Sequence, residues 1–68
     1  MGELLANRLK ERRAELGLTQ AELAERVGVT RKTVNTVENR VFTPSTLLAL
    51  KLAEALDVTV EHLFWIDE

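Results

Sequence analysis

The chain has 68 residues, 46% of them hydrophobic and 29% charged, which is typical of one small globular domain rather than a disordered segment. Without cysteine and with one histidine, it excludes disulfides, thiolate metal sites and metal sites built from several histidines of one chain. The net charge of −2 is unevenly distributed: residues 1–40 carry eight basic and six acidic side chains, whereas residues 41–68 carry one and five. This asymmetry is compatible with a domain that presents one face to a polyanion.

The longest apolar runs, 47–50 and 63–66, are far shorter than the ~20 residues of a membrane helix. The chain does not start with a basic segment, an apolar run and a cleavage site, so we expect no secretory signal. We expect one cytoplasmic domain over residues 1–68 with no membrane segment, no cofactor and no evident small-molecule ligand. Because a core of this size supplies only ~3–5 kcal/mol, self-association is the reinforcement that remains.

Leucines recur at helical spacing over residues 5–16 with charges between them, and Gly17 ends this first predicted helix. Its start is open. Either Asn7 caps the helix and the residues before it are extended, or the helix begins near Glu3.

Capping signals define the next two helices. Thr19 and Glu22 form a capping box that predicts the start of a second helix, which Gly28 ends. Thr30 is the expected cap of a third helix over roughly 31–39.

Two more helices complete the chain. Pro44, after Thr43, suits the first position of a fourth helix, which is apolar on most sides over residues 47–56 and is therefore expected to be central. Thr59 predicts the start of a short fifth helix. The expected fold class is all-α, a compact five-helix bundle.

Residues 20–37 carry the most specific pattern. Counting Gln20 as the first position, small Ala24 is fifth and allows two helices to approach closely, and Gly28 is ninth and redirects the backbone. Apolar residues at five further positions seal this helix pair onto the rest of the bundle: Leu23, Val27, Val29, Val34 and Val37. Together these positions predict a helix-turn-helix.

The segment LGLTQAELAERVGVTRKTVNTVENRVFTPS resembles the helix-turn-helix of the phage-repressor and Cro-like family, also called XRE-like regulators. The likeness runs from about Asn7 to Phe64, and ALKLAEALDVTVEHLF resembles the fourth and fifth helices of that family. The resemblance implies a lambda-repressor-like fold and a sequence-specific DNA-binding transcriptional regulator, usually a dimer. Asp57 stands where the family commonly has Gly or Asn, and Asp tolerates the left-handed conformation moderately well.

Helical phase selects the residues of the third helix that could reach DNA. At 100° per residue, Val34 and Val37 define the buried side, and the exposed stripe contains no acid and no large apolar group. Its side chains offer donors for guanine, an amide for adenine and a methyl for thymine. On their own, such residues could also simply solvate an exposed helix.

Resemblance to the family adds roles at matching positions. The residues expected to read bases in the major groove are Arg31, Lys32 and Thr36. The resemblance implies phosphate contacts for Gln20 and Asn39. Thr30 is expected to approach a phosphate or a thymine methyl, Asn35 to contact a phosphate or solvent, and Arg40 to contact a phosphate from its place just beyond the helix. The family also implies an ion pair between Arg13 and Glu38, whereas Lys10 and Arg12 are expected to be solvated or to act as long-range attractants.

The apolar end of the chain suggests a partner surface. We expect Phe64, Trp65 and Ile66 to contact a second subunit, with the tail extended and paired to residues 1–5 in a small two-stranded sheet. The alternative is that Phe64 completes the core and Trp65 covers its edge. His62 has no cysteine or serine partner nearby in sequence, so no enzyme activity is expected.

The sequence therefore predicts a regulator, most simply a repressor, that binds double-stranded DNA as a homodimer on a near-palindromic operator, with helix 31–39 in the major groove. The alternative is a protein-interaction module of the same fold that does not bind DNA, which the net negative charge favours.

Overall fold

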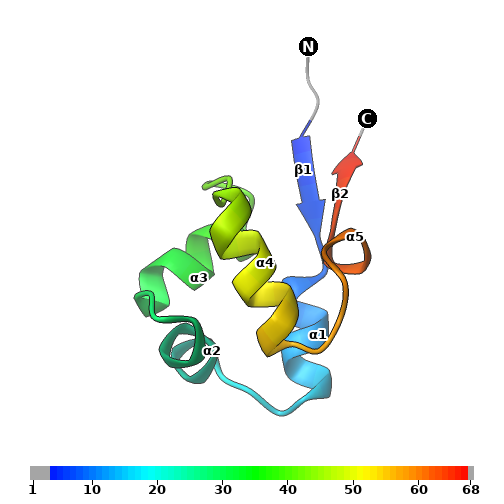
Figure 1. Cartoon of the computed structure of the whole chain (residues 1–68). Helices are drawn as coiled ribbons and strands as arrows, with labels where there is room; N and C mark the ends of the chain where they lie inside the picture. The colour runs from blue at the N-terminus through cyan, green and yellow to red at the C-terminus, as the bar shows by residue number, and fades with distance from the viewer. Residues whose placement is uncertain (1–3, 68) are drawn as a thin grey trace.

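The computed structural model describes residues 4–67. Its elements in chain order are β1 (Leu4–Asn7), α1 (Leu9–Glu15), α2 (Gln20–Val27), α3 (Arg31–Glu38), α4 (Thr46–Ala55), α5 (Val60–Leu63) and β2 (Phe64–Asp67). The helices pack into one body, and the two strands lie side by side at one end of it (Figure 1). The predicted five-helix bundle with a small terminal sheet is confirmed.

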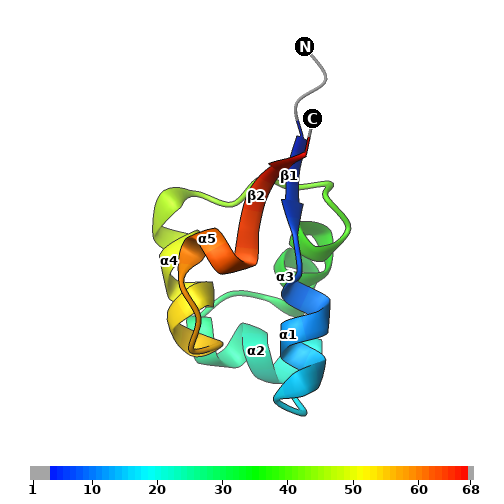
Figure 2. The same ribbon diagram turned by 90° about the vertical axis from the view of Figure 1, so that its right-hand side faces the viewer.

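The sheet joins the two ends of the described chain. β1 and β2 are antiparallel, and their register pairs Leu5 with Ile66 and Ala6 with Trp65. Figure 2 shows both strands extending beyond the helices. Residues 1–3, which the predicted pairing also included, lie outside the described residues.

Asn7 decides where the first helix begins. Its Oδ1 accepts a hydrogen bond from the backbone N–H of Leu9 at 3.0 Å, and its Nδ2 donates to the carbonyl of Val37 at 3.0 Å. The prediction that the residues before Asn7 are extended is confirmed for residues 4–6, and the start near Glu3 is wrong. Asn7 is not itself the cap, because Arg8 occupies the N-cap position and α1 begins at Leu9. The same side chain ties the start of α1 to the end of α3.

Hydroxyl caps start the other four helices, as the side chain of each cap accepts from the backbone N–H three residues later. These caps are Thr19, Thr30, Ser45 and Thr59. The capping box of Thr19 and Glu22 is confirmed. The predicted place of Pro44 in the first turn of the fourth helix is wrong, because Ser45 caps that helix and α4 begins at Thr46.

Four residues end helices in the left-handed conformation: Gly17, Gly28, Arg40 and Asp57, with φ of 69°, 77°, 62° and 57°. The expected tolerance of Asp57 for this conformation is confirmed. After each of them the chain turns back toward the preceding helix.

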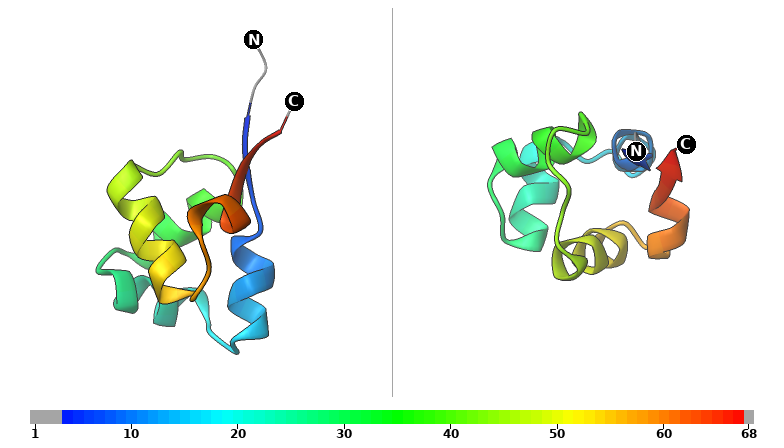
Figure 3. Two further views of the ribbon diagram at one scale, coloured as in Figure 1. Left: turned by 45° about the vertical axis from the view of Figure 1, so that its right-hand side comes forward. Right: turned by 90° about the horizontal axis from the view of Figure 1, so that it is seen from above.

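The core lies among the helices and closes with Phe64 at the sheet. Its fully buried large side chains are Leu9, Leu23, Val34, Val37, Leu52, Leu56 and Leu63. The fourth helix is less central than expected: Leu52 and Ala53 are buried, but Leu47 and Leu50 are 63% and 54% exposed. Seen from above in Figure 3, α4 lies at the periphery between α2 and α5. In the part of the chain that the structure describes, no helix has the length and apolar character needed to cross a membrane.

Candidate nucleic-acid interface

A tight helix pair forms the frame of the site. α2 ends at Gly28, and α3 starts after Thr30, so only a short turn separates them. Ala24 is 3% exposed, and its carbonyl accepts from the backbone N–H of Val29 at 3.0 Å. The small side chain and the left-handed glycine thus play the parts that their spacing predicted.

α3 has one buried face and one open face. Val34 and Val37 are each 1% exposed and attach the helix to the core. Arg31 and Lys32 are exposed and Thr36 is half-buried, and none of these three predicted base-reading residues belongs to the core cluster. The Oγ1 of Thr36 donates to the carbonyl of Thr33 at 2.9 Å, so its hydroxyl hydrogen is used inside the helix.

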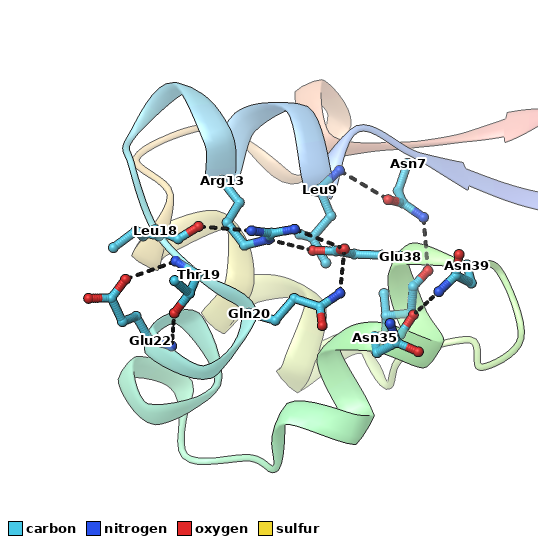
Figure 4. A network of polar contacts seen from close by, with 11 residues as sticks. Asn7, Leu9, Arg13, Leu18, Thr19, Gln20, Glu22, Asn35, Glu38 and Asn39 are labelled. Carbon is cyan, nitrogen blue, oxygen red and sulfur yellow. Dashed lines mark hydrogen bonds and ion pairs between the residues drawn. The ribbon is translucent and has the colours of Figure 1, made fainter.

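A polar network fixes α3 relative to α1 and α2 (Figure 4). The guanidinium of Arg13 binds both carboxylate oxygens of Glu38, with Nε–Oε2 at 2.7 Å and Nη2–Oε1 at 3.3 Å, and Nη1 donates to the carbonyl of Leu18 at 2.8 Å. The Nε2 of Gln20 donates to Glu38 Oε1 at 2.9 Å. The predicted ion pair is confirmed, and the Glu38 side chain within it is only 4% exposed.

The predicted phosphate-contacting residues divide into two groups. Asn35 is exposed on α3, and Thr30 caps the helix through an exposed Oγ1, so both stand at the open face. Gln20 and Asn39 already donate inside the protein, Gln20 to Glu38 and Asn39 to the carbonyl of Asn35 at 2.9 Å. Each of these two amides has a second hydrogen left for another acceptor.

Arg40 turns away from the open face of α3. Its left-handed backbone leads its Nη1 to Asp67 Oδ2 at 2.9 Å, on β2. This ion pair is exposed on both sides and joins the end of α3 to the sheet.

Arg12 is not simply solvated, as the sequence suggested. Its Nε donates to the carbonyl of Leu56 at 2.8 Å, and its Nη1 pairs with Glu15 at 3.1 Å. The guanidinium therefore satisfies a carbonyl at the C-terminal end of α4, where a positive charge also complements the helix dipole.

The apolar tail divides between two environments. Phe64 is 6% exposed and completes the core of its own chain, so it offers little surface to a second subunit, and the alternative prediction fits it better. The guanidinium carbon of Arg8 lies 4.8 Å from the centre of the Trp65 ring, so a cation covers that ring. Ile66 is 61% exposed.

Sequence reasoning missed two pairs of exposed apolar residues. Val41 and Phe42 follow α3, and the backbone N–H groups of both donate to the carbonyl of Thr36, at 2.9 and 3.1 Å. Leu47 and Leu50 lie on the outer side of α4. Two adjacent apolar residues in a short loop are the sequence signal for the first pair. The second pair has no such signal, because α4 is apolar on most sides and its sequence does not show which leucines are exposed.

Hydrogen bonds at the start of α2 change the pKa of Glu22. The backbone N–H of Thr19 and then its hydroxyl hydrogen-bond the Glu22 carboxylate and lower its pKa below the ordinary value of 4.5. An ionised Glu22 therefore supports the helix start at neutral pH.

A helix pair with a tight turn, whose second helix shows an open polar face without acids, defines a helix-turn-helix DNA-binding domain. The family model described as Helix-turn-helix matches residues 9–63. The chain belongs to this family, as an XRE-like regulator.

Relatives and solved structures agree with that assignment. An uncharacterized HTH-type transcriptional regulator of Bacillus subtilis (strain 168), YgzD, is 45% identical over 64 residues, which cover 94% of this chain and 97% of that protein. The restriction-modification controller protein C.AhdI of Aeromonas hydrophila has a TM-score of 0.77 and 40% identity, covering 81% of this chain and 80% of its own. The P22 c2 repressor, solved with a synthetic operator, has a TM-score of 0.78 and 29% identity, covering 81% and 83%.

Proposed function

We propose that this DNA-binding regulator acts as a homodimeric repressor on a near-palindromic operator, with α3 of each subunit in a major groove. The open face of α3 carries the proposal. Arg31, Lys32 and Thr36 stand there without an acidic neighbour, while Val34 and Val37 hold the helix to the core. An α-helix fits the width of the major groove of B-DNA.

Each side chain has a role that suits its chemistry. Arg31 and Lys32 donate to guanine O6 and N7, and the methyl of Thr36 contacts a thymine methyl. Thr30 and Asn35 approach phosphates from the open face, and Gln20 and Asn39 contribute their second amide hydrogens. Arg40 pairs with Asp67 on β2 through Nη1, and because this ion pair is exposed, its other guanidinium N–H groups remain available for the proposed phosphate contact.

The second subunit is proposed to cover an apolar face made by α4, α5 and the sheet. A groove lined by Leu5, Ala49, Leu50 and Val60 lies there, and Leu47 and Ile66 are exposed large apolar side chains of the same helix and sheet. Leu5 and Ile66 are cross-strand partners, so they share one face of the sheet. A two-fold dimer spaces the two α3 helices by one turn of DNA, ~34–36 Å.

Selection of duplexes from a random pool tests DNA binding, symmetry and half-site spacing together. The affinity for the selected duplex is expected to fall with salt, with a log–log slope of about −0.9 for each phosphate neutralised. A double variant, Lys32→Ala with Thr36→Ala, is expected to lose at least ~10-fold in affinity while it stays folded, because each good base contact contributes ~1–3 kcal/mol. Lys51→Ala is the matched control, because it removes one exposed positive charge that lies on α4 rather than on α3.

If the double variant bound its operator like the parent, the assigned contacts would be wrong. The net charge of −2 favours one other function, a protein-interaction module of this fold. Weak, salt-insensitive association with every duplex would support that module instead.

Subunit association has a separate test. Leu47→Ser and Leu50→Ser are expected to shift the sedimenting species from dimer to monomer at micromolar concentration, whereas Leu16→Ser, at an exposed leucine after α1, leaves it unchanged. A protein that sediments as a monomer before any substitution would refute the dimer.

A further inference from the structure

An apolar residue follows each of the four left-handed helix ends, and in three of the four cases it packs on the core. α1, α2, α3 and α4 each end in a Schellman motif, in which the left-handed residue is followed by one whose N–H returns to a carbonyl of the last helical turn. The residues that follow are Leu18, Val29, Val41 and Val58, whose N–H groups bind the carbonyls of Arg13, Ala24, Thr36 and Ala53 at 3.0, 3.0, 2.9 and 3.0 Å.

In three of the four motifs the apolar residue packs on the core. Leu18 is buried, and Val29 and Val58 are partly buried against the core cluster. This is the ordinary arrangement, because the motif brings an apolar residue against the preceding turn. Val41 departs from it: with 78% exposure it is the most exposed large apolar residue among those described.

Val41 folds back beside Thr36 and Asn35, the residues five and six positions before it on the open face of α3. Val41 is therefore held beside the proposed DNA-reading surface by two backbone hydrogen bonds to Thr36, its own and that of Phe42. Unlike the other three residues, Val41 is not part of the core cluster or packed against it.

A shallow groove extends this observation. It is lined by Lys32, Thr33, Thr36, Val41, Phe42 and Leu48, so it runs from the proposed base-reading residues to the start of α4. Its lining combines the apolar Val41, Phe42 and Leu48 with the cationic Lys32. An apolar protein segment filling the groove would have to desolvate that cation, whereas DNA offers an apolar group flanked by anions.

We propose that this groove, with Val41 as its main contact, receives the C5-methyl group of a thymine in each half-site and so selects thymine at that position. The thymine methyl is the apolar group of the major-groove edges. The proposal rests on the proposed function, since it places the groove in the DNA interface. It adds a second apolar reader to the methyl of Thr36.

Replacing thymine by deoxyuridine in the selected operator tests the proposal, because the exchange removes only the methyl group. At one thymine per half-site, the exchange is expected to weaken binding of the parent protein about fourfold, the factor associated with burying one methyl-sized group. Val41→Ala is expected to weaken binding to the thymine operator and to show no further loss with uridine at that position. Phe42→Ala is expected to reduce the same sensitivity in part.

Two controls separate the groove from its surroundings. Thr36→Ser removes only the methyl of Thr36 and is expected to keep the uridine sensitivity that Val41→Ala loses. Leu16→Ala removes an exposed leucine outside the groove and is expected to bind like the parent. Circular dichroism verifies that each variant is folded.

The outcomes also separate this inference from the function on which it rests. Specific binding in which no thymine is methyl-sensitive, or in which every methyl-sensitive thymine keeps its sensitivity in Val41→Ala, would overturn the groove and leave the regulator intact. If Val41→Ala converted a dimer to a monomer, the groove would be a subunit contact and the inference wrong. If the pool yielded no specific duplex, the proposed function itself would fail, and the thymine site with it.

Discussion

The ion pair of Arg13 and Glu38 links the stability of the domain to the position of α3. Replacing Arg13 by Met keeps much of its apolar stem and removes the guanidinium. The Glu38 carboxylate, with a side chain 4% exposed, then keeps one partner in the structure, the Nε2 of Gln20. The carbonyl of Leu18 loses its donor as well.

The expected loss is large for a domain of this size. Leaving one member of a buried ion pair without its partner costs ~3–5 kcal/mol. That is comparable with the whole stability that a core of this length supplies, ~3–5 kcal/mol. Arg13→Met alone is therefore expected to be largely unfolded at 25 °C. The double replacement Arg13→Met with Glu38→Leu removes the stranded charge and is expected to recover most of the lost stability.

Urea denaturation followed by far-ultraviolet circular dichroism measures this cycle, at one fixed protein concentration because association contributes to the apparent stability. The parent, both single variants and the double variant give the coupling free energy. A cost below ~1 kcal/mol for Arg13→Met, or a double variant no more stable than that single variant, would refute the reasoning. The second result would show that the loss comes from the contact with Leu18 rather than from the charge on Glu38.

Three smaller effects are expected at helix ends. Glu22→Gln is expected to lower the urea midpoint at pH 7. Hydrogen bonds from Thr19 lower the Glu22 pKa, so the difference from the parent is expected to shrink as the pH falls from 4.5 through that lowered pKa. A difference that does not change with pH would contradict this. Asp57→Gly is expected to raise the melting temperature by about 4 °C in a thermal scan, since glycine adopts a φ of 57° without strain; an unchanged or lower melting temperature would show that Asp57 is not strained. Arg12→Ala is expected to cost ~1 kcal/mol in urea denaturation through the loss of its hydrogen bond to the Leu56 carbonyl, and no loss would mean that water replaces the guanidinium there.

Signals confined to a few residues were sufficient for much of the fold. Thr19, Thr30 and Thr59 were identified as caps because a cap and the N–H that it binds are three residues apart. Pro44 misled because proline suits the turn before a helix as well as its first position, and Ser45 has the hydroxyl that α4 needs. The sheet is predicted only from the apolar end of the chain, because a strand of four residues has little pattern of its own.

Polar contacts between distant residues were beyond the sequence. Asn7 and Val37 are 30 residues apart, and Arg12 and Leu56 are 44 apart, so no spacing rule connects them. A single helical wheel likewise identifies the open face of α3 but says nothing of the residues after the helix. The ion pair of Arg40 with Asp67 depends on the left-handed backbone of Arg40 and on the sheet, which the wheel does not include.

The structure also revises the charge that the domain offers to DNA. Four of the eight cations among residues 1–40 are engaged within the chain by an acid or an aromatic ring: Arg8, Arg12, Arg13 and Arg40. Arg31 and Lys32 are exposed on α3, and neither forms an ion pair within residues 4–67. Few cations are therefore left for each proposed half-site. The salt dependence of the DNA affinity is expected to be shallower than that of a protein with six to ten phosphate contacts. Neutral donors and apolar contacts such as Val41 must then supply a larger share of the binding free energy, and these depend on the bases rather than on the phosphates.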